Sequence, residues 1–305
     1  MNFLDIFLPI LTIFVYILIG YILRITNKVD FDATKTFSTV AVNVFLPAII
    51  IRTYVNNLSI DNIAENLELI FWGAIVISSL YALSFVLSKL FTKDDYEKKV
   101  YRYTFTTSNY GAIGYALVAS LFGEVGLFRF MMVTLPVSLF AYTEGFRILS
   151  NSKKINAKFL LSPAIIAIVI GIVLGLTGVK LPSFFTNIMD ALANMFSPIS
   201  MIITGIAIAS YPFKKVFLNK KTYLVAIIKM VVLPLVIMGI MLLIGVSKEV
   251  VVLVTTFCML PLGMNTIIFP RSLGKDCMIG VQTVSVGTAL SLITMPLFVW
   301  LFTLI

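Results

Sequence analysis

Two polar stretches inside otherwise apolar segments carry the side chains of this chain that are best suited to bind a small ligand. Residues 106–117 read TTSNYGAIGYAL and hold Asn109, whereas residues 260–270 read LPLGMNTIIFP and hold Asn265. An asparagine amide donates and accepts hydrogen bonds, so it can bind an anion or a water molecule. If helices are interrupted there, the N-termini of the half-helices add partial positive charge without a buried cation. The two stretches therefore predict a site for an anionic ligand.

The proline and the glycines beside the two asparagines predict that both segments are broken helices. Proline removes a backbone donor and clashes with the preceding turn, while glycine tolerates an unwound backbone that a ligand can approach closely. The alternative is that each asparagine only forms hydrogen bonds between helices. The candidate substrate-binding residues are Asn109, Tyr110, Gly111, Gly114, Pro261, Gly263 and Asn265.

Catalytic and metal chemistry have little support in the sequence. The chain has no histidine, its two cysteines show no CxxC spacing, and it contains no GxGD, GxSxG, HExxH or nucleotide-binding motif. We therefore expect no catalytic residue, no metal site and no cofactor. A polar stripe of Gln282, Thr283 and Ser285 could contribute oxygens to a bound ion such as sodium. Hydrogen bonding between helices is the favoured interpretation of this stripe.

The composition predicts that membrane-spanning helices position these residues. Sixty per cent of the 305 residues are hydrophobic and 12% are charged, which is too apolar for a soluble domain. Ten apolar segments of about 20 residues, the length that crosses a bilayer, predict an all-α integral membrane protein. They cover residues 6–23, 34–53, 68–88, 101–121, 127–147, 159–178, 188–209, 222–244, 249–269 and 277–302. The two polar stretches belong to the fourth and ninth segments.

The basic residues alternate between the connections. Of the 23 Lys and Arg residues, 18 fall in odd-numbered connections and four in even-numbered ones, namely Arg52, Arg129, Lys180 and Lys248. The positive-inside rule then makes the odd-numbered connections cytoplasmic and both termini extracytoplasmic. No basic cluster interleaves with exposed aromatic residues, so we expect no nucleic-acid partner. Lys229 lies inside the eighth segment, where snorkelling to the cytoplasmic surface is favoured and a substrate or coupling role stays open.

The chain also repeats itself. Residues 43–47 read NVFLP and residues 194–198, which lie 151 positions later, read NMFSP. At the same offset Gly20 meets Gly171. Several ordered matches of this kind favour an ancient duplication over the general frequency of glycine and proline in membrane helices.

The repeat predicts two halves, residues 1–150 and 156–305, with five expected segments each. Because five is odd, the second half enters the membrane from the opposite side. An inverted-topology repeat of this type is typical of secondary transporters, which bind substrate near the middle of the membrane where helices are interrupted.

Three stretches resemble the auxin efflux carrier family. SNYGAIG at residues 108–114 resembles its Asn-x-Gly-x-x-Gly phrase, LPLGMNTIIF at 260–269 its Pro-x-x-x-Asn phrase, and SPISMIITGIAI at 197–208 its Pro-hydrophobic-Gly helix. The resemblance implies a fold similar to that of bile acid–sodium symporters. It also implies a scaffold domain from helices 1, 2, 6 and 7, a transport domain from helices 3–5 and 8–10, a crossing of helices 4 and 9, and a homodimer through the scaffold.

Together these features predict a secondary transporter in the cell membrane. It would move a small organic anion, an auxin-like carboxylate or a dicarboxylate, across the lipid bilayer by alternating access. Coupling to sodium, to protons or to neither stays open. The alternative is a membrane receptor or sensor that binds a small ligand without transporting it.

Overall fold

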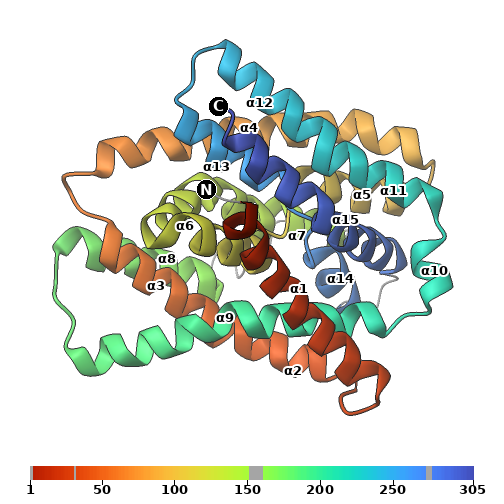
Figure 1. The fold of residues 1–305 in the computed structure, drawn as a ribbon, viewed down its shortest axis with the longest axis horizontal. Helices are drawn as coiled ribbons and strands as arrows, with labels where there is room; N and C mark the ends of the chain where they lie inside the picture. Colours follow the sequence, from red (N-terminus) through yellow and green to blue (C-terminus); the bar gives the residue numbers. More distant parts are fainter. Residues whose placement is uncertain (1–2, 31, 151–160, 273–276) are drawn as a thin grey trace.

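A computed structural model describes residues 3–30, 32–150, 161–272 and 277–305 of the chain. Every regular element in these ranges is a helix (Figure 1), which confirms the predicted all-α class. The predicted boundary between the halves lies outside the described residues, as do four lysines of the charge count, Lys153, Lys154, Lys158 and Lys275.

The described helices fall into the two predicted halves of the chain. The first half contains α1 (Phe3–Ile25), α2 (Ala33–Val40), η1 (Ala41–Phe45), α3 (Leu46–Asn57), α4 (Ile63–Phe91), α5 (Asp95–Thr106), η2 (Tyr110–Gly114), α6 (Tyr115–Phe140), η3 (Ala141–Gly145) and α7 (Phe146–Ser150). The second half contains α8 (Pro163–Thr177), α9 (Ser183–Ala209), α10 (Phe213–Phe217), α11 (Lys220–Ile227), η5 (Ile228–Val232), α12 (Leu233–Leu243), α13 (Lys248–Met259), α14 (Asn265–Ser272) and α15 (Met278–Phe302).

Two of the wide π-helical turns, η1 and η5, have a visible cause in the sequence. Each directly precedes a Leu-Pro pair, with Pro47 after η1 and Pro234 after η5. Proline has no backbone N–H and its ring clashes with the carbonyl four residues earlier, so a widened turn before it relieves the clash. The helix therefore continues through the proline instead of ending there.

Seven helical stretches of the described chain are long and apolar enough to cross a membrane. One of them, residues 95–150, covers 56 residues, more than twice the roughly 20 that span a bilayer, and includes the non-helical residues 107–109. This stretch kinks at Gly123, whose φ of 69° lies in the left-handed region. The expected sixth and ninth segments do not reach the required length, because α8 has 15 residues and the ninth is divided into α13 and α14. The chain is thus a multi-pass membrane protein, and the number of ten spans stays a prediction.

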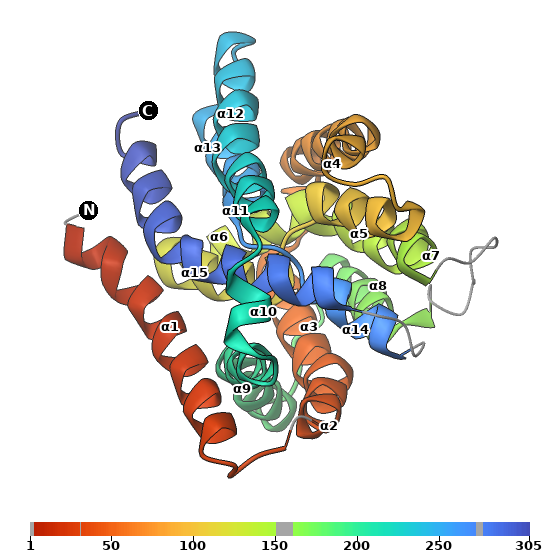
Figure 2. The same ribbon diagram turned by 90° about the vertical axis from the view of Figure 1, so that its right-hand side faces the viewer.

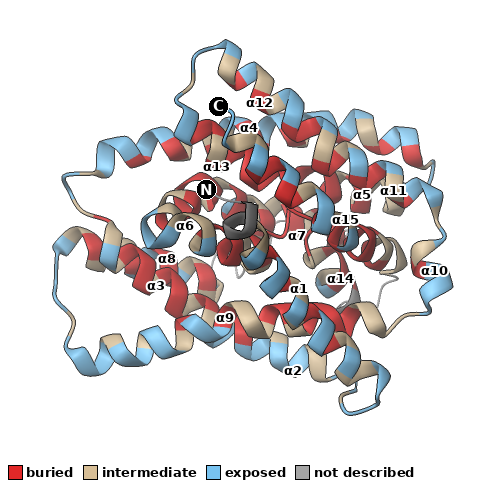
Figure 3. Cartoon of the chain, viewed as in Figure 1, coloured by how far each residue is buried: buried red, intermediate tan, exposed pale blue. Residues whose placement is uncertain are grey.

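The side chains are arranged as lipid requires. Figure 3 shows exposed residues along the outward sides of α4, α9 and α12. Many of them are large and apolar, such as Phe71, Phe184 and Leu243. Polar residues such as Thr104 and Thr255 are instead fully buried. In a bilayer the apolar surface faces lipid and the polar groups pack inside.

The helices fall into two packed groups. In the first group α1 packs against α9, and α3 packs against both α8 and α9. In the second group α4 packs against α5 and α6, and α12 packs against α13. Figures 1 and 2 agree on this division: α3, α8 and α9 lie on the lower side of the molecule, and α4, α12 and α13 lie on the upper side.

Glycines at repeat-related positions give the first group its closest contacts. A Cβ atom at Gly20 on α1 would lie 2.0 Å from the carbonyl oxygen of Ile202 on α9. A Cβ at Gly171 on α8 would lie 2.8 Å from the Cβ of Tyr54 on α3. Only glycine permits these approaches without displacement. Thus α1 packs on α9 and α8 packs on α3, so the first expected segment of each half packs on the second expected segment of the other half, as two repeats related by a two-fold axis would.

Candidate functional site

Two interruptions of helical structure lie within the predicted polar stretches. In the first half, α5 ends at Thr106 and helical structure resumes at Tyr110. In the second half, α13 ends at Met259 and α14 begins at Asn265. The residues between, 107–109 and 260–264, are not helical.

The two interruptions contact each other through the backbone. The N–H of Asn109 donates a 2.7 Å hydrogen bond to the carbonyl oxygen of Pro261. A Cβ at Gly263 would lie 3.3 Å from the carbonyl oxygen of Ser108, so this glycine allows the two segments to approach each other. Two segments that are far apart in the sequence therefore meet at one point. There a backbone N–H and a carbonyl oxygen that are not used in a helix form a hydrogen bond with each other.

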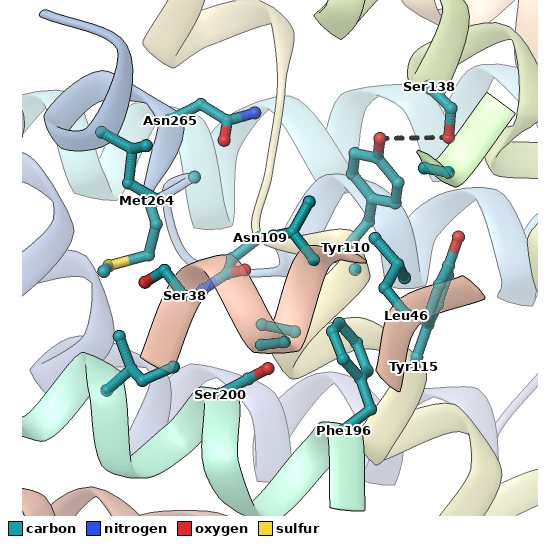
Figure 4. Close-up of a pocket in the computed structure, with 18 of the residues that line it drawn as sticks. Ser38, Leu46, Asn109, Tyr110, Tyr115, Ser138, Phe196, Ser200, Met264 and Asn265 are labelled. Carbon is teal, nitrogen blue, oxygen red and sulfur yellow. Dashed lines mark hydrogen bonds between the residues drawn. The ribbon is translucent and has the colours of Figure 1, made fainter. Parts of the chain in front are cut away.

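A cavity of about 130 Å³ lies beside this contact. It is lined by both interruptions and by α8 and α9. It is also lined by the continuous helical rod that α2, η1 and α3 form over residues 33–57. Figure 4 shows Asn109 in the middle of the lining, with Asn265 and Met264 on one side and Tyr110 and Tyr115 on the other. The lining combines hydroxyl and amide groups with apolar side chains, and none of the described residues that line it is charged.

Five of the seven predicted substrate-binding residues line the cavity: Asn109, Tyr110, Gly111, Gly263 and Asn265. The structure does not bring the other two to it. Gly114 lies under the side chain of Leu260, because a Cβ there would be 2.6 Å from Leu260 Cδ1. Pro261 is buried and contributes its carbonyl oxygen to the backbone contact.

The two asparagine amides differ in their hydrogen bonding. The Nδ2 of Asn109 is buried and has no partner among the described residues. The Nδ2 of Asn265 donates a 2.8 Å hydrogen bond to the hydroxyl of Tyr103 on α5. The Tyr110 hydroxyl donates to Ser138 Oγ at 3.1 Å (Figure 4). Asn109 is therefore a lining residue with a buried donor left for a ligand, and the neighbouring Ser108 hydroxyl, which also lines the cavity, has no partner among the described residues either.

The polar stripe of α15 lies elsewhere. The Gln282 amide bonds to Asn219 and to the carbonyl oxygen of Lys215, and Thr283 bonds to carbonyl oxygens of its own helix. Ser285 is buried, and none of the three residues lines the cavity. Among the described residues no group of three or more His, Cys, Asp or Glu side chains could hold a metal ion. The favoured interpretation, hydrogen bonding between helices, agrees with the contacts of Gln282, whereas the bonds of Thr283 stay within α15.

Lys229 contradicts the snorkelling expectation. Its side chain is fully buried on η5, with Nζ 3.5 Å from the carbonyl oxygen of Cys258 and 5.4 Å from the centre of the Phe257 ring. Cys258 belongs to the last turn of α13, so the ammonium group lies against the negative end of that helix dipole. The side chain therefore lies inside the protein beside the end of α13 and not at the membrane surface. Lys229 does not line the cavity.

Several cavity residues were not recognised from the sequence. Ser38 on α2, and Phe196 and Ser200 on α9, line the cavity opposite the interruptions. The two serines are hydroxyls inside apolar segments, but serines with no ligand role look the same because their hydroxyls can bond within their own helix. Which helix faces the cavity depends on tertiary packing.

The geometry is that of a multi-pass membrane protein with a cavity at two interrupted helical segments. A family model for membrane transport proteins matches the chain twice, over residues 5–158 and 147–299. The chain therefore belongs to this membrane transport protein family, the auxin efflux carrier family, as the sequence motifs predicted. The double match confirms that the chain contains two repeats. The family is one of transporters and not of enzymes. No curated protein matches the chain significantly.

Proposed function

We propose that the chain is a secondary transporter that moves a small organic carboxylate across the cell membrane by alternating access. The observation that carries this proposal is the Nδ2 of Asn109, which is buried beside the cavity and unpartnered among the described residues. Leaving a buried donor unpaired costs roughly 1–3 kcal/mol. A ligand that supplies an acceptor oxygen there recovers this free energy.

The electrostatics of the cavity favour an anionic acceptor. The helical segment that begins with η2 at Tyr110 and the helix α14 at Asn265 both start at the cavity. Helix N-termini carry partial positive charge and stabilise anions. Because the described part of the chain places no charged residue in the lining, no carboxylate there repels the anion and no fixed cation there retains it. A transporter must release what it binds, so a neutral lining suits the task.

The size and apolar part of the lining favour a small acid with an apolar body. An engineered cavity of roughly 150 Å³ holds a benzene molecule, and this cavity has about 130 Å³. Leu46, Ile50 and Phe196 supply apolar contacts on the side of α3 and α9. A monocarboxylate with a ring or a short chain matches this combination better than a dicarboxylate. The second carboxylate would need polar partners on the apolar side of the cavity.

The architecture proposed for transport has ten spans, with both termini extracytoplasmic and the interrupted fourth and ninth helices crossing at the cavity. The group of α1, α3, α8 and α9 would be the scaffold, and the group of α4, α5, α6, α12 and α13 would belong to the transport domain. The division into two packed groups supports this assignment. A homodimer through the scaffold follows from the family resemblance.

Uptake into proteoliposomes tests the proposal. The purified chain would be reconstituted and offered a panel of labelled monocarboxylates and dicarboxylates, each beside its neutral amide, with and without sodium and pH gradients. We expect saturable uptake of at least one carboxylate and none of its amide. The gradient that accelerates uptake identifies the coupling ion. Saturable binding without uptake of any compound would instead indicate a receptor.

A further inference from the structure

An arginine outside the cavity joins the two groups of helices. Arg52 on α3 is 9% exposed, and its Nη2 lies 2.8 Å from Glu124 Oε1. Its Nη1 lies 2.9 Å from Asn194 Oδ1 and 3.8 Å from Asp190 Oδ1, both on α9. The proposed function does not use this cluster.

The partners of Arg52 belong to different groups. Asp190 and Asn194 lie on α9, which packs with α3 in the first group. Glu124 lies on α6, directly after the left-handed Gly123 where that helix kinks. The bond from Arg52 to Glu124 therefore bridges the groups, whereas the bonds to α9 stay within one.

The bridge is placed to close one side of the cavity. Ile50 and Phe196 line the cavity, two positions before Arg52 on α3 and two after Asn194 on α9. Arg52 lies near one end of the rod of α2, η1 and α3. Ser38, near the other end, is the residue of this rod that lines the cavity farthest from Arg52. The charge pattern of the connections assigns the Arg52 end to the outside of the membrane.

The bridge is also suited to repeated breaking. The Glu124 side chain is 50% exposed, so water can solvate this carboxylate when it leaves Arg52. Arg52 keeps Asn194 and the nearby Asp190, so its buried guanidinium is not left without acceptors. An uncompensated buried charge would make separation far more costly.

We propose that Arg52 and Glu124 form the outer gate of the transporter, an ion pair that holds the cavity closed to the outside in this conformation. This inference rests on the proposed function. When the group that contains α6 moves relative to α3 and α9, Glu124 leaves Arg52 and the cavity opens outward.

The chain contains a matched control pair. Arg129 Nε lies 2.8 Å from Glu249 Oε1, and the pair joins α6 to α13. Both helices would belong to the transport domain, so this pair should stay intact when the domain moves. It has the same chemistry and the same predicted side of the membrane as the gate.

Labelling of a cavity cysteine tests the gate without any substrate. Ser200→Cys would be introduced after Cys258 and Cys277 are replaced by alanine, and right-side-out vesicles would be treated with a membrane-impermeant maleimide. We expect Glu124→Gln to raise the labelling rate about fivefold, the upper range for an exposed ion pair. Glu249→Gln should leave the rate unchanged. Arg52→Gln combined with Glu124→Gln should label no faster than the faster single variant, because the residues act through one bond.

The outcomes separate this inference from the proposed function. An unchanged labelling rate in Glu124→Gln, or an equal rise in Glu249→Gln, would overturn the gate. Because labelling needs no transported compound, a chain that takes up no carboxylate can still have the gate, and a carboxylate transporter can lack it. Size-exclusion profiles of the purified variants show whether each one is folded.

Discussion

The backbone N–H of Asn109 donates a 2.7 Å hydrogen bond to the carbonyl oxygen of Pro261, and this bond joins the two interrupted segments. Because it uses main-chain atoms on both sides, it survives replacement of the Asn109 side chain. The junction and the ligand site can therefore be tested separately. The Nδ2 of Asn109 faces no partner among the described residues, whereas the Nδ2 of Asn265 is held by Tyr103.

Replacing the two asparagines should affect stability differently. Asn265→Ala removes the partner of the buried Tyr103 hydroxyl and should lower the free energy of unfolding by about 1–3 kcal/mol. Asn109→Ala removes a donor that has no partner, so we expect a smaller loss. Thermal unfolding of purified protein without ligand measures both. Tyr103→Phe is the control, since it breaks the same bond from the other side; equal losses for the two alanine variants would contradict the assignment.

Replacing the two glycines of η2, directly after the first interruption, should have two different effects. A Cβ at Gly111 would meet no atom within 4 Å, whereas one at Gly114 would lie 2.6 Å from Leu260 Cδ1 and 3.1 Å from Phe130 Cε1. Gly114→Ala should therefore destabilise the protein by about 1–3 kcal/mol through overpacking. Gly111→Ala should leave stability nearly unchanged and instead reduce uptake, because its methyl group enters the cavity. The yield of folded protein and the uptake rate measure the two effects, and a folded Gly114→Ala with normal thermal stability would argue against this packing.

The sequence was sufficient for the features that depend on local composition. The apolar content predicted a helical membrane protein, and the glycines and prolines around Asn109 and Asn265 placed the non-helical residues 107–109 and 260–264 within the two predicted stretches. Proline and glycine act on the backbone wherever they occur, so such features can be inferred without knowing the neighbours.

Features that depend on neighbouring helices could not be inferred. Lys229 could have reached the membrane surface, and only the position of the α13 end explains why its ammonium group lies inside. Gly114 and Gly111 look alike in the sequence, yet one contacts Leu260 and the other faces open space. Arg52 was counted as an ordinary residue of a connection, although it is buried among partners from two other helices.

The predicted topology can be tested with single cysteines at basic positions. Lys180 follows α8 and Lys214 lies on α10, and the connections that hold them lie at opposite ends of the molecule in Figure 1. In intact cells an impermeant thiol reagent should label Lys180→Cys and spare Lys214→Cys, because the basic residues of α10 are retained in the cytoplasm. Inside-out vesicles should give the reverse result. Labelling of both positions from the same side would rule out this topology.

The most direct test of the central claim is the half-saturation concentration for carboxylate uptake into proteoliposomes by Asn109→Ala. A hydrogen bond to a charged group contributes about 1.5–3 kcal/mol, so the variant should need roughly ten to a hundred times more substrate. Asn43→Ala is the matched control, since the Asn43 amide is exposed, bonds to the Thr39 carbonyl oxygen and does not line the cavity. The account predicts a raised value for Asn109→Ala and an unchanged value for Asn43→Ala. An unchanged value for folded Asn109→Ala would contradict the claim that this cavity binds the transported anion.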